Sequence, residues 1–262
     1  MINAILVPLR NAAHLTRRAH LTFAAQDCDP APEILYIDNA STDNTPQMLA
    51  GWDCHVLRNS APKSVARSWN QGLKWWFKQG AEYVLVCNND VELRPDTYRW
   101  LLKAGGLFVT AVGSDSVEAI APPYNPPDLT SVRYNPDFSC FLLHRKLWDM
   151  VGPFDESYLG AYGEDASYDI KMRTAGVLAY CISIPFYHVA SGTLKHSTPK
   201  EQAVICRQAD SNRTTFFNQF GVQIGSSEYY ALLEKLCPSV PVCGNESIEE
   251  KGYLIDYQKD RD

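Results

Sequence analysis

A cluster of polar side chains follows an apolar run in the first half of the chain. Residues Tyr83 to Cys87 are largely apolar and predict a strand buried on both faces. Asn88, Asn89 and Asp90 follow at once. Ligands bind at the carboxyl ends of strands in open α/β sheets, and a carboxylate there suits a divalent cation that also contacts phosphate oxygens. A turn or capping role for Asp90 is the structural alternative.

Three further polar clusters stand at the expected ends of strands or in loops. They are Pro8-Leu9-Arg10-Asn11, Asp38-Asn39-Ala40-Ser41-Thr42-Asp43, and Tyr162-Gly163-Glu164-Asp165 with His188 further on. In a parallel sheet the first two share one edge with residues 88–90. A nucleotide can lie across that edge, with Asp38 accepting a hydrogen bond from a base N–H or a ribose hydroxyl. Asp90 would then hold a metal that bridges the diphosphate.

The elements that must position these clusters alternate between strand and helix. Strands are predicted over residues 2–9, 34–37, 54–57 and 82–87, and helices after Asn11, from Thr45-Pro46 and over 62–79. Asn11 and Thr45 are the expected helix caps. This alternation implies a parallel sheet with right-handed crossovers.

From Pro95 the pattern loosens. Helices are expected over residues 95–104, 145–150, 165–175, 199–220 and 227–236, and strands over 138–143, 178–184 and 186–188. Residues 121–137 are proline-rich and predict a long loop over a site. The last 20 residues are acidic and weakly patterned, which is typical of a tail.

Composition excludes several classes of protein. A chain of 262 residues fits one large domain or two tightly joined halves. The net charge of −6 argues against a generic nucleic-acid binder or anionic-membrane binder. None of the 8 cysteines has CxxC spacing, which argues against a zinc site. Several cysteines stand in apolar runs as small core residues, and a reducing compartment is expected. No signal peptide and no run of about 20 apolar residues is visible, so a membrane role would act from the surface.

The chain resembles the inverting glycosyltransferases of family 2, which have the GT-A fold. The resemblance covers roughly residues 2–221. It rests on five motifs in order: Asp38 to Thr45 (D-N-x-S-x-D-x-T), Ser68 to Leu73 (A-x-N-x-G-[IL]), Asn88 to Asp90 (the Asp-x-Asp-type metal motif), Gly152 to Glu156 with Tyr162 to Asp165 (G-G-F-D-E … E-D), and His188 to Gly192 (His-x-x-x-Gly).

The resemblance implies a role for each matching residue. Asp165 would be the general base that deprotonates the acceptor hydroxyl, with Glu164 binding the acceptor or positioning Asp165. Asp90 would be the main ligand of Mg²⁺ or Mn²⁺, and His188 or His196 a further ligand of the metal or the diphosphate. Residues implied at the nucleotide site are Pro8, Arg10, Asn11, Asp38, Asn70, Asn88 and Asn89.

Each role has a structural alternative. Glu164 and Asp165 could be favourable charges at a helix N-terminus, and His188 a core histidine. Trp69, Trp75 and Trp76 recur at helical spacing, which is more typical of a core than of a sugar platform.

The sequence also departs from the family pattern. Asn88 stands where the metal motif often has Asp, so substrate phosphates must complete the metal shell. Ser167 and Lys171 replace the usual Asp and Arg after Glu164, which puts acceptor binding in doubt more than catalysis. The absence of a Gln-x-x-Arg-Trp element argues against the processive synthases of the family.

The predicted fold is α/β of the GT-A (Rossmann-like) type. It is a mixed, mostly parallel sheet flanked by helices, in a single domain of two abutting halves with a C-terminal helical extension. Residues 1–95 would bind the nucleotide sugar and residues 96–222 the acceptor, with a helix and acidic tail over 223–262.

The predicted reaction is transfer of one sugar, with inversion and with a metal, from a nucleotide-diphosphate sugar. A UDP-sugar is favoured, and the acceptor is a hydroxyl of a glycan or of a lipid-linked or protein-linked glycoconjugate. A cytoplasmic location without nucleic-acid partners is expected, and peripheral membrane contact and oligomeric state stay open. The alternatives are a non-catalytic nucleotide- or sugar-binding module and a nucleotidyltransferase; the lack of glycine in residues 8–13 disfavours the latter.

Overall fold

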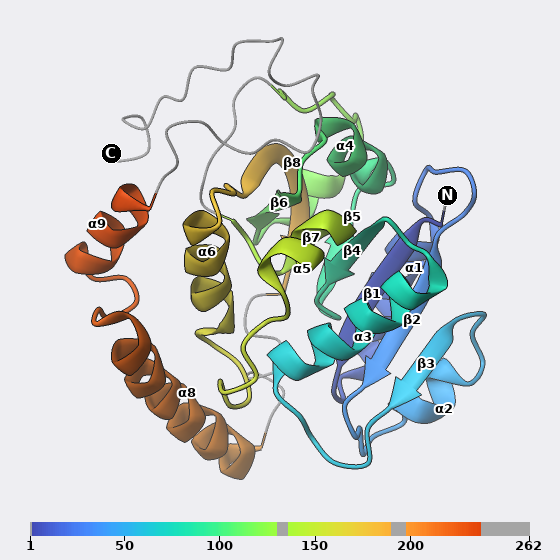
Figure 1. Cartoon of the computed structure of the whole chain (residues 1–262). Coiled ribbons are helices and arrows are strands. Elements are labelled where there is room, and N and C mark those ends of the chain that lie inside the picture. The colour runs from blue at the N-terminus through green and yellow to red at the C-terminus, as the bar shows by residue number, and fades with distance from the viewer. Residues whose placement is uncertain (1, 130–135, 190–197, 237–262) are drawn as a thin grey trace.

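The computed structural model describes residues 2–129, 136–189 and 198–236. Its centre is one mixed sheet of eight strands in the order β3-β2-β1-β4-β7-β6-β8-β5, flanked by helices (Figure 1). The strands are β1 (Ala4–Leu9), β2 (Glu33–Asp38), β3 (His55–Arg58), β4 (Tyr83–Cys87), β5 (Val91–Leu93), β6 (Phe108–Ser114), β7 (Cys140–His144) and β8 (Tyr180–His188).

The helices of the described chain follow the predicted alternation. They are α1 (Ala13–Ala24), α2 (Thr45–Leu49), α3 (Val65–Gln79), α4 (Thr97–Ala104), α5 (Arg145–Val151), α6 (Glu164–Thr174), α8 (Pro199–Phe220) and α9 (Ser227–Lys235), with a 3₁₀ turn η1 (Val117–Ile120). No helix in the part of the chain that the structure describes is long and apolar enough to cross a membrane.

The sheet combines a parallel half with an antiparallel insertion. β1 pairs in parallel with β2 and β4, and β2 pairs in parallel with β3. β7 then lies antiparallel between β4 and β6, while β8 runs parallel to β6 and antiparallel to β5. The first four strands therefore end at one edge, as predicted, and β5 returns at the far end of the sheet.

Alternating side chains of the strands build a core on each face of the sheet. Ala4 and Leu6 of β1 pack with α3, α5 and α6, whereas Ile5 and Val7 pack with α1, α2 and α4. This period of two is the strand geometry that buries both faces. The same holds for β4, so the prediction of a doubly buried strand at 83–87 is confirmed.

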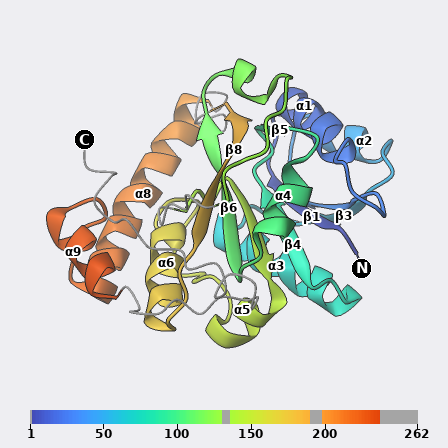
Figure 2. The same ribbon diagram turned by 90° about the horizontal axis from the view of Figure 1, so that it is seen from above.

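The last two described helices add a smaller third core. Figure 2 shows α8 and α9 beside α6, on the flank away from α1 and α2. Phe216 of α8 and Tyr229 of α9 pack with Ile170 of α6 and with Tyr158, which precedes that helix. The C-terminal extension is thus attached to the helix that begins at Glu164.

Several sequence-based assignments are corrected. β6 was not predicted, although an apolar run follows Gly105-Gly106, and the short β5 was not recognised as a strand. β8 runs through Pro185, since the ladder with β6 is irregular there and a residue without an N–H is tolerated at a bulge.

Neither expected helix cap forms. α1 begins after Ala12, with no side-chain cap. The Asn11 carboxamide oxygen instead accepts from Thr42 N–H. Thr45 is the first residue inside α2, not its cap.

A glycine sets the distance between α3 and β1. A Cβ on Gly72 would collide with Leu6 Cδ1 and lie 2.7 Å from Cδ2, and Leu6 is fully buried. We expect Gly72→Ala to lower the free energy of unfolding by about 1–3 kcal/mol through overpacking, despite the better helix propensity of Ala. Urea denaturation measures it. The double variant with Leu6→Val should lose less than the sum of the two single losses; simple additivity would contradict this contact.

Candidate active site

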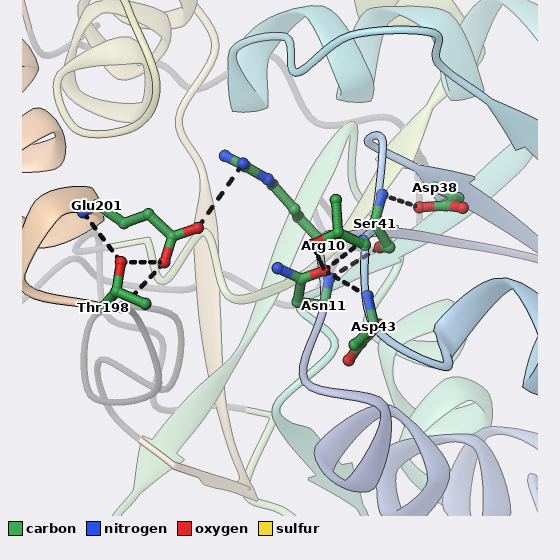
Figure 3. Close-up of polar contacts among 8 residues, drawn as sticks. Arg10, Asn11, Asp38, Ser41, Asp43, Thr198 and Glu201 are labelled. Atoms are coloured by element: carbon green, nitrogen blue, oxygen red, sulfur yellow. Dashed lines mark hydrogen bonds and ion pairs between the residues drawn. The ribbon is translucent and has the colours of Figure 1, made fainter.

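The loops after β1 and β2 are joined by a network of short hydrogen bonds (Figure 3). Asn11 N–H donates to Ser41 Oγ at 2.8 Å, and Thr42 N–H donates to Asn11 Oδ1 at 2.8 Å. Ala13 N–H donates to Asp43 Oδ2 at 3.2 Å. Partial burial pushes the pKa of Asp43 up, but hydrogen bonds from Thr45 and Ala13 outweigh it, so the pKa lies below its usual value. Asp43 therefore ties the start of α1 to the β2 loop as a carboxylate.

Asp38 is buried at the end of β2 and already fixed. Its exposed fraction is 1%. Oδ1 accepts from Ser41 N–H at 2.9 Å, and Oδ2 lies 2.6 Å from Arg58 Nη1. Arg58 also donates to the Ser41 carbonyl at 2.8 Å. A carboxylate can accept about four hydrogen bonds, so these partners fix Asp38 and still leave it able to accept a further hydrogen bond.

Arg58 was missed at the sequence level. It is the last residue of β3 and lies opposite Asp38 in the β2–β3 ladder. The signal that could have found it is that two neighbouring predicted strands, 34–37 and 54–57, are each followed directly by a charged residue.

The two residues predicted at the metal are brought together. His188 Nε2 lies 3.3 Å from Asp90 Oδ1. The cause is the β5–β8 ladder, in which Val91 pairs with His188 and Val189 N–H donates to the Asp90 carbonyl. Asp90 is buried and His188 is partly exposed, so the pair lies at the surface of the sheet end.

Helix α1 fastens the segment that carries Asp90. Asn89 Nδ2 donates to Thr16 Oγ1 at 2.9 Å, and Leu93 N–H donates to Thr22 Oγ1 at 3.1 Å. Arg18 forms an ion pair with Glu92 at 2.6 Å. Three side chains of α1 thus hold residues 89–93, and Asn89 faces the helix in this arrangement.

Asn88 and Asn70 lie at different depths. Asn88 is half-buried, and its N–H donates to the Ser139 carbonyl at 2.9 Å. Asn70 is 1% exposed, and its amide exchanges two 2.9 Å hydrogen bonds with the Phe154 backbone. Its Nδ2 also donates to Glu156 Oε1 at 3.0 Å. Asn70 therefore ties α3 to the 154–156 loop, and its predicted nucleotide contact stays a prediction.

A cavity of about 900 Å³ opens beside the end of β1, within the usual range of ligand pockets. Of the predicted site residues, Arg10 and Asn11 line it. The other walls are the start of α3, residues 156–160 and the first turns of α8. The sequence did not assign α8 to this site.

The charges in the cavity wall are mixed and partly paired. Arg10, Lys63, Arg67 and Lys200 line it together with Glu156 and Glu201. Arg10 approaches Glu201 at 3.9 Å across the cavity (Figure 3), and Arg67 approaches Glu156 at 3.7 Å. All four side chains of these pairs are well exposed, so the pairs contribute little stability. Two arginines are thus available to an anionic ligand.

Glu164 and Asp165 stand in the first turn of α6 in different environments. Glu164 is 5% exposed, and its Oε2 has no hydrogen-bond partner within the described residues. Burial, and then the charge of Asp165, raise the pKa of Glu164 to about 8. Asp165 is half-buried, and its Oδ1 accepts from Gly163 N–H at 3.2 Å and Ala166 N–H at 2.8 Å. At pH 7 Glu164 is therefore a neutral neighbour of a fixed carboxyl group.

The backbone before Glu164 adopts uncommon conformations. Gly160, Tyr162 and Gly163 have φ of 61°, 79° and 102°. For Tyr162 this region costs on the order of 1–3 kcal/mol and persists only where the surroundings fix it. Gly163 packs on the ring of Tyr158, which also lines the cavity. The start of α6 thus adjoins the cavity wall through Tyr158.

The family model of glycosyl transferase family 2 matches residues 4–104, from β1 through α4. This segment contains the loops of Arg10, Asp38 and Asp90. No curated protein sequence matches the chain.

Solved glycosyltransferases share the fold at low sequence identity. S. aureus TarS is 15% identical over 91% of this chain, with a TM-score of 0.56, and the match spans 50% of TarS. TarS 1-349 in complex with UDP-GlcNAc is also 15% identical (TM-score 0.57, 90% of this chain and 71% of that one). Mannosyltransferase PcManGT from Pyrobaculum calidifontis, in complex with GDP-Man and Mn²⁺, is 16% identical (TM-score 0.53, 88% and 78%).

The fold of the chain is the GT-A fold of these glycosyltransferases, and residues 4–104 match the model of glycosyl transferase family 2. The predicted fold class is confirmed, and the family match over residues 4–104 agrees with the predicted family and enzyme class. The roles of individual residues stay predictions, and His196 lies outside the described residues.

The buried Glu164 makes stability depend on pH. Its pKa is raised from 4.5 to about 8 on folding, so the stability it contributes is fully present below about 4.5 and is lost as pH rises towards 8. We expect the unfolding free energy of wild type to fall relative to Glu164→Gln across this window, by up to about 1.4 kcal/mol per pH unit.

Urea denaturation is measured from about pH 5 to about pH 8.5 in steps of about half a pH unit, and the unfolding free energies give this slope. Glu228→Gln, at a fully exposed carboxyl group of α9, is the control and should follow wild type. Parallel curves for wild type and Glu164→Gln would show that Glu164 titrates normally.

Proposed function

We propose that the protein is a metal-dependent inverting glycosyltransferase that moves one sugar from a nucleotide-diphosphate sugar to an acceptor hydroxyl. The observation that carries the proposal is the contact of Asp90 with His188, 3.3 Å apart at the end of the sheet. Two residues almost 100 positions apart, chosen by motif for one metal, meet in the folded chain.

The donor side of the proposal rests on the carboxyl edge of β1, β2 and β4. Asp38 would accept from a base N–H, and Pro8, Arg10 and Asn11 would line the nucleotide with Asn70, Asn88 and Asn89 nearby. The cavity beside Arg10 supports this placement, since it has the volume of a ligand site and two exposed arginines.

The residues beside Asp90 suit a divalent cation in part. Carboxylate oxygen is a ligand for both Mg²⁺ and Mn²⁺, and imidazole nitrogen for transition metals. Within the described residues no group of three His, Cys, Asp or Glu side chains is gathered for a metal, so diphosphate oxygens and water must supply the remaining ligands. When bound, the cation offsets the negative charge that develops on the leaving nucleoside diphosphate.

The acceptor side of the proposal rests on the start of α6. Asp165 takes the proton of the acceptor hydroxyl. The hydroxyl oxygen bonds to the anomeric carbon of the donor sugar as the bond from that carbon to the diphosphate breaks. Burial favours the protonated form of Glu164, which suits it to binding or positioning next to the half-buried Asp165. The proposal requires room for a hexose between Asp90 and Asp165.

The substrate class is the finer part of the proposal. A UDP-sugar is favoured because Asp38 suits the donor N–H of uracil, and TarS 1-349 has been solved with UDP-GlcNAc. Guanosine donors are also tested, because PcManGT was solved in complex with GDP-Man. The acceptor is a glycan or a lipid-linked or protein-linked glycoconjugate. Residues 1–95 would serve the donor and 96–222 the acceptor.

A reducing, cytoplasmic location is part of the same proposal. Six cysteines of the described chain are free thiols, which suits a reducing compartment. Contact with a membrane surface would bring the enzyme to a lipid-linked acceptor.

Loss of the Asp90 carboxylate should remove metal-dependent turnover. A panel of UDP-, GDP- and dTDP-sugars is assayed for hydrolysis with and without Mn²⁺, and the best donor is used for the variants. We expect Asp90→Ala to lose about 100-fold or more, since one preorganised electrostatic group is worth that much. Asp149→Ala, at an exposed carboxylate of α5, is the control. A Mn²⁺-stimulated Asp90→Ala enzyme would refute the metal assignment.

Asp165 should separate donor binding from turnover. We expect Asp165→Asn to bind UDP with Mn²⁺ as wild type does in calorimetry, and to lose about 100-fold or more of turnover, because a general base contributes that range. Asp149→Asn is the matched control. Near wild-type turnover in Asp165→Asn would mean that another group is the base, and binding of UDP without turnover in wild type would favour a non-catalytic module.

A further inference from the structure

Asn212, on the buried face of α8, holds the loop that leads into α6. We call residues 159–163 the α6 loop. Asn212 is 1% exposed, and its Oδ1 accepts from Leu159 N–H at 2.8 Å. Its Nδ2 donates to the carbonyls of Leu159 at 2.8 Å, Ala161 at 3.0 Å and Tyr162 at 2.8 Å. One side chain therefore contacts four backbone groups of three loop residues.

The α6 loop needs such a support. Tyr162 is a non-glycine residue at φ 79°, and it is 51% exposed. A conformation of this kind is kept only when neighbouring groups over-determine it. The Asn212 amide contacts the Tyr162 carbonyl directly, and Glu164 and Asp165 follow within three residues.

The same loop is joined to the donor side. Val65 N–H, at the start of α3, donates to the Gly160 carbonyl at 2.7 Å. Gln208 of α8 packs on Gly160, where an added Cβ would meet its side chain. The loop thus lies between the helix that lines the cavity at Arg67 and the helix that carries Asn212.

We propose that Asn212 is a positioning residue, which fixes the α6 loop so that Asp165 is held at the productive distance from the bound donor. The inference rests on the proposed function, because it takes Asp165 as the base. Asn212 lies outside the segment that matches the family model, so the inference assigns α8 a part in the reaction.

A purely structural role is the competing explanation. Asn212 lies one turn before Phe216, which packs in the core shared by α8, α9 and Tyr158. On that explanation, loss of the amide would lower the melting temperature and leave the turnover of the folded enzyme unchanged. Turnover and loop protection, measured below the melting temperature, separate the two roles.

The experiment compares Asn212→Ala and the milder Asn212→Ser with Asn218→Ala, at an exposed asparagine of the same helix. Amide hydrogen exchange of the α6 loop is measured first. We expect exchange of the Leu159 amide to rise at least about tenfold in both Asn212 variants and to stay at the wild-type rate in Asn218→Ala.

Kinetics are then measured with the best donor of the nucleotide-sugar panel. We expect kcat to fall about 10- to 100-fold in Asn212→Ala, because small displacements of a reacting group cost that much. Calorimetry should give a Kd for UDP with Mn²⁺ within about threefold of wild type, since the donor edge of the sheet is untouched.

Three results would overturn the inference while leaving the proposed function intact. They are unchanged loop exchange, unchanged kcat in a loosened loop, and failure of both Asn212 variants to fold. A wild-type enzyme that turns over no nucleotide sugar would instead defeat the proposed function, and the positioning role with it.

Discussion

The short antiparallel ladder between β5 and β8 is the interaction on which the candidate site depends. Three residue pairs join two strands that are almost 100 residues apart in the sequence. Without this ladder Asp90 and His188 would not meet, because His188 comes from the other half of the chain. Side chains of α1 bond residues 89–93 and so hold the segment that carries Asp90 on its other side.

Local patterns were enough to predict the first half of the fold. β1, β2, β3 and β4 are clear apolar runs followed by polar residues, and their parallel pairing follows from the helices between them. The second half was harder, because β6 and β8 pair across long separations and β5 has three residues. Strands of that length carry no periodic signal, so only tertiary pairing defines them.

The candidate site shows the same limit. Motif order predicted roles for Asp38, Asp90, Asp165 and His188, but not the residues that hold Asp38 or the loop before Asp165. Arg58 and Asn212 are ordinary residues in sequence and become important through register and helix packing. The predicted capping role of Asn11 was wrong for a related reason: its side chain bonds the β2 loop, while Asp43 bonds the start of α1.

The paired charges of the cavity have a consequence for how anions enter it. Arg10 faces Glu201 and Arg67 faces Glu156. An anion that binds these arginines would therefore exchange one counter-charge for another instead of neutralising a bare cation. Long-range attraction is weak in such a site, and added salt weakens the resident pairs along with the new ones. Selection among anions then rests on shape and on bidentate fit to the guanidinium groups, not on total charge.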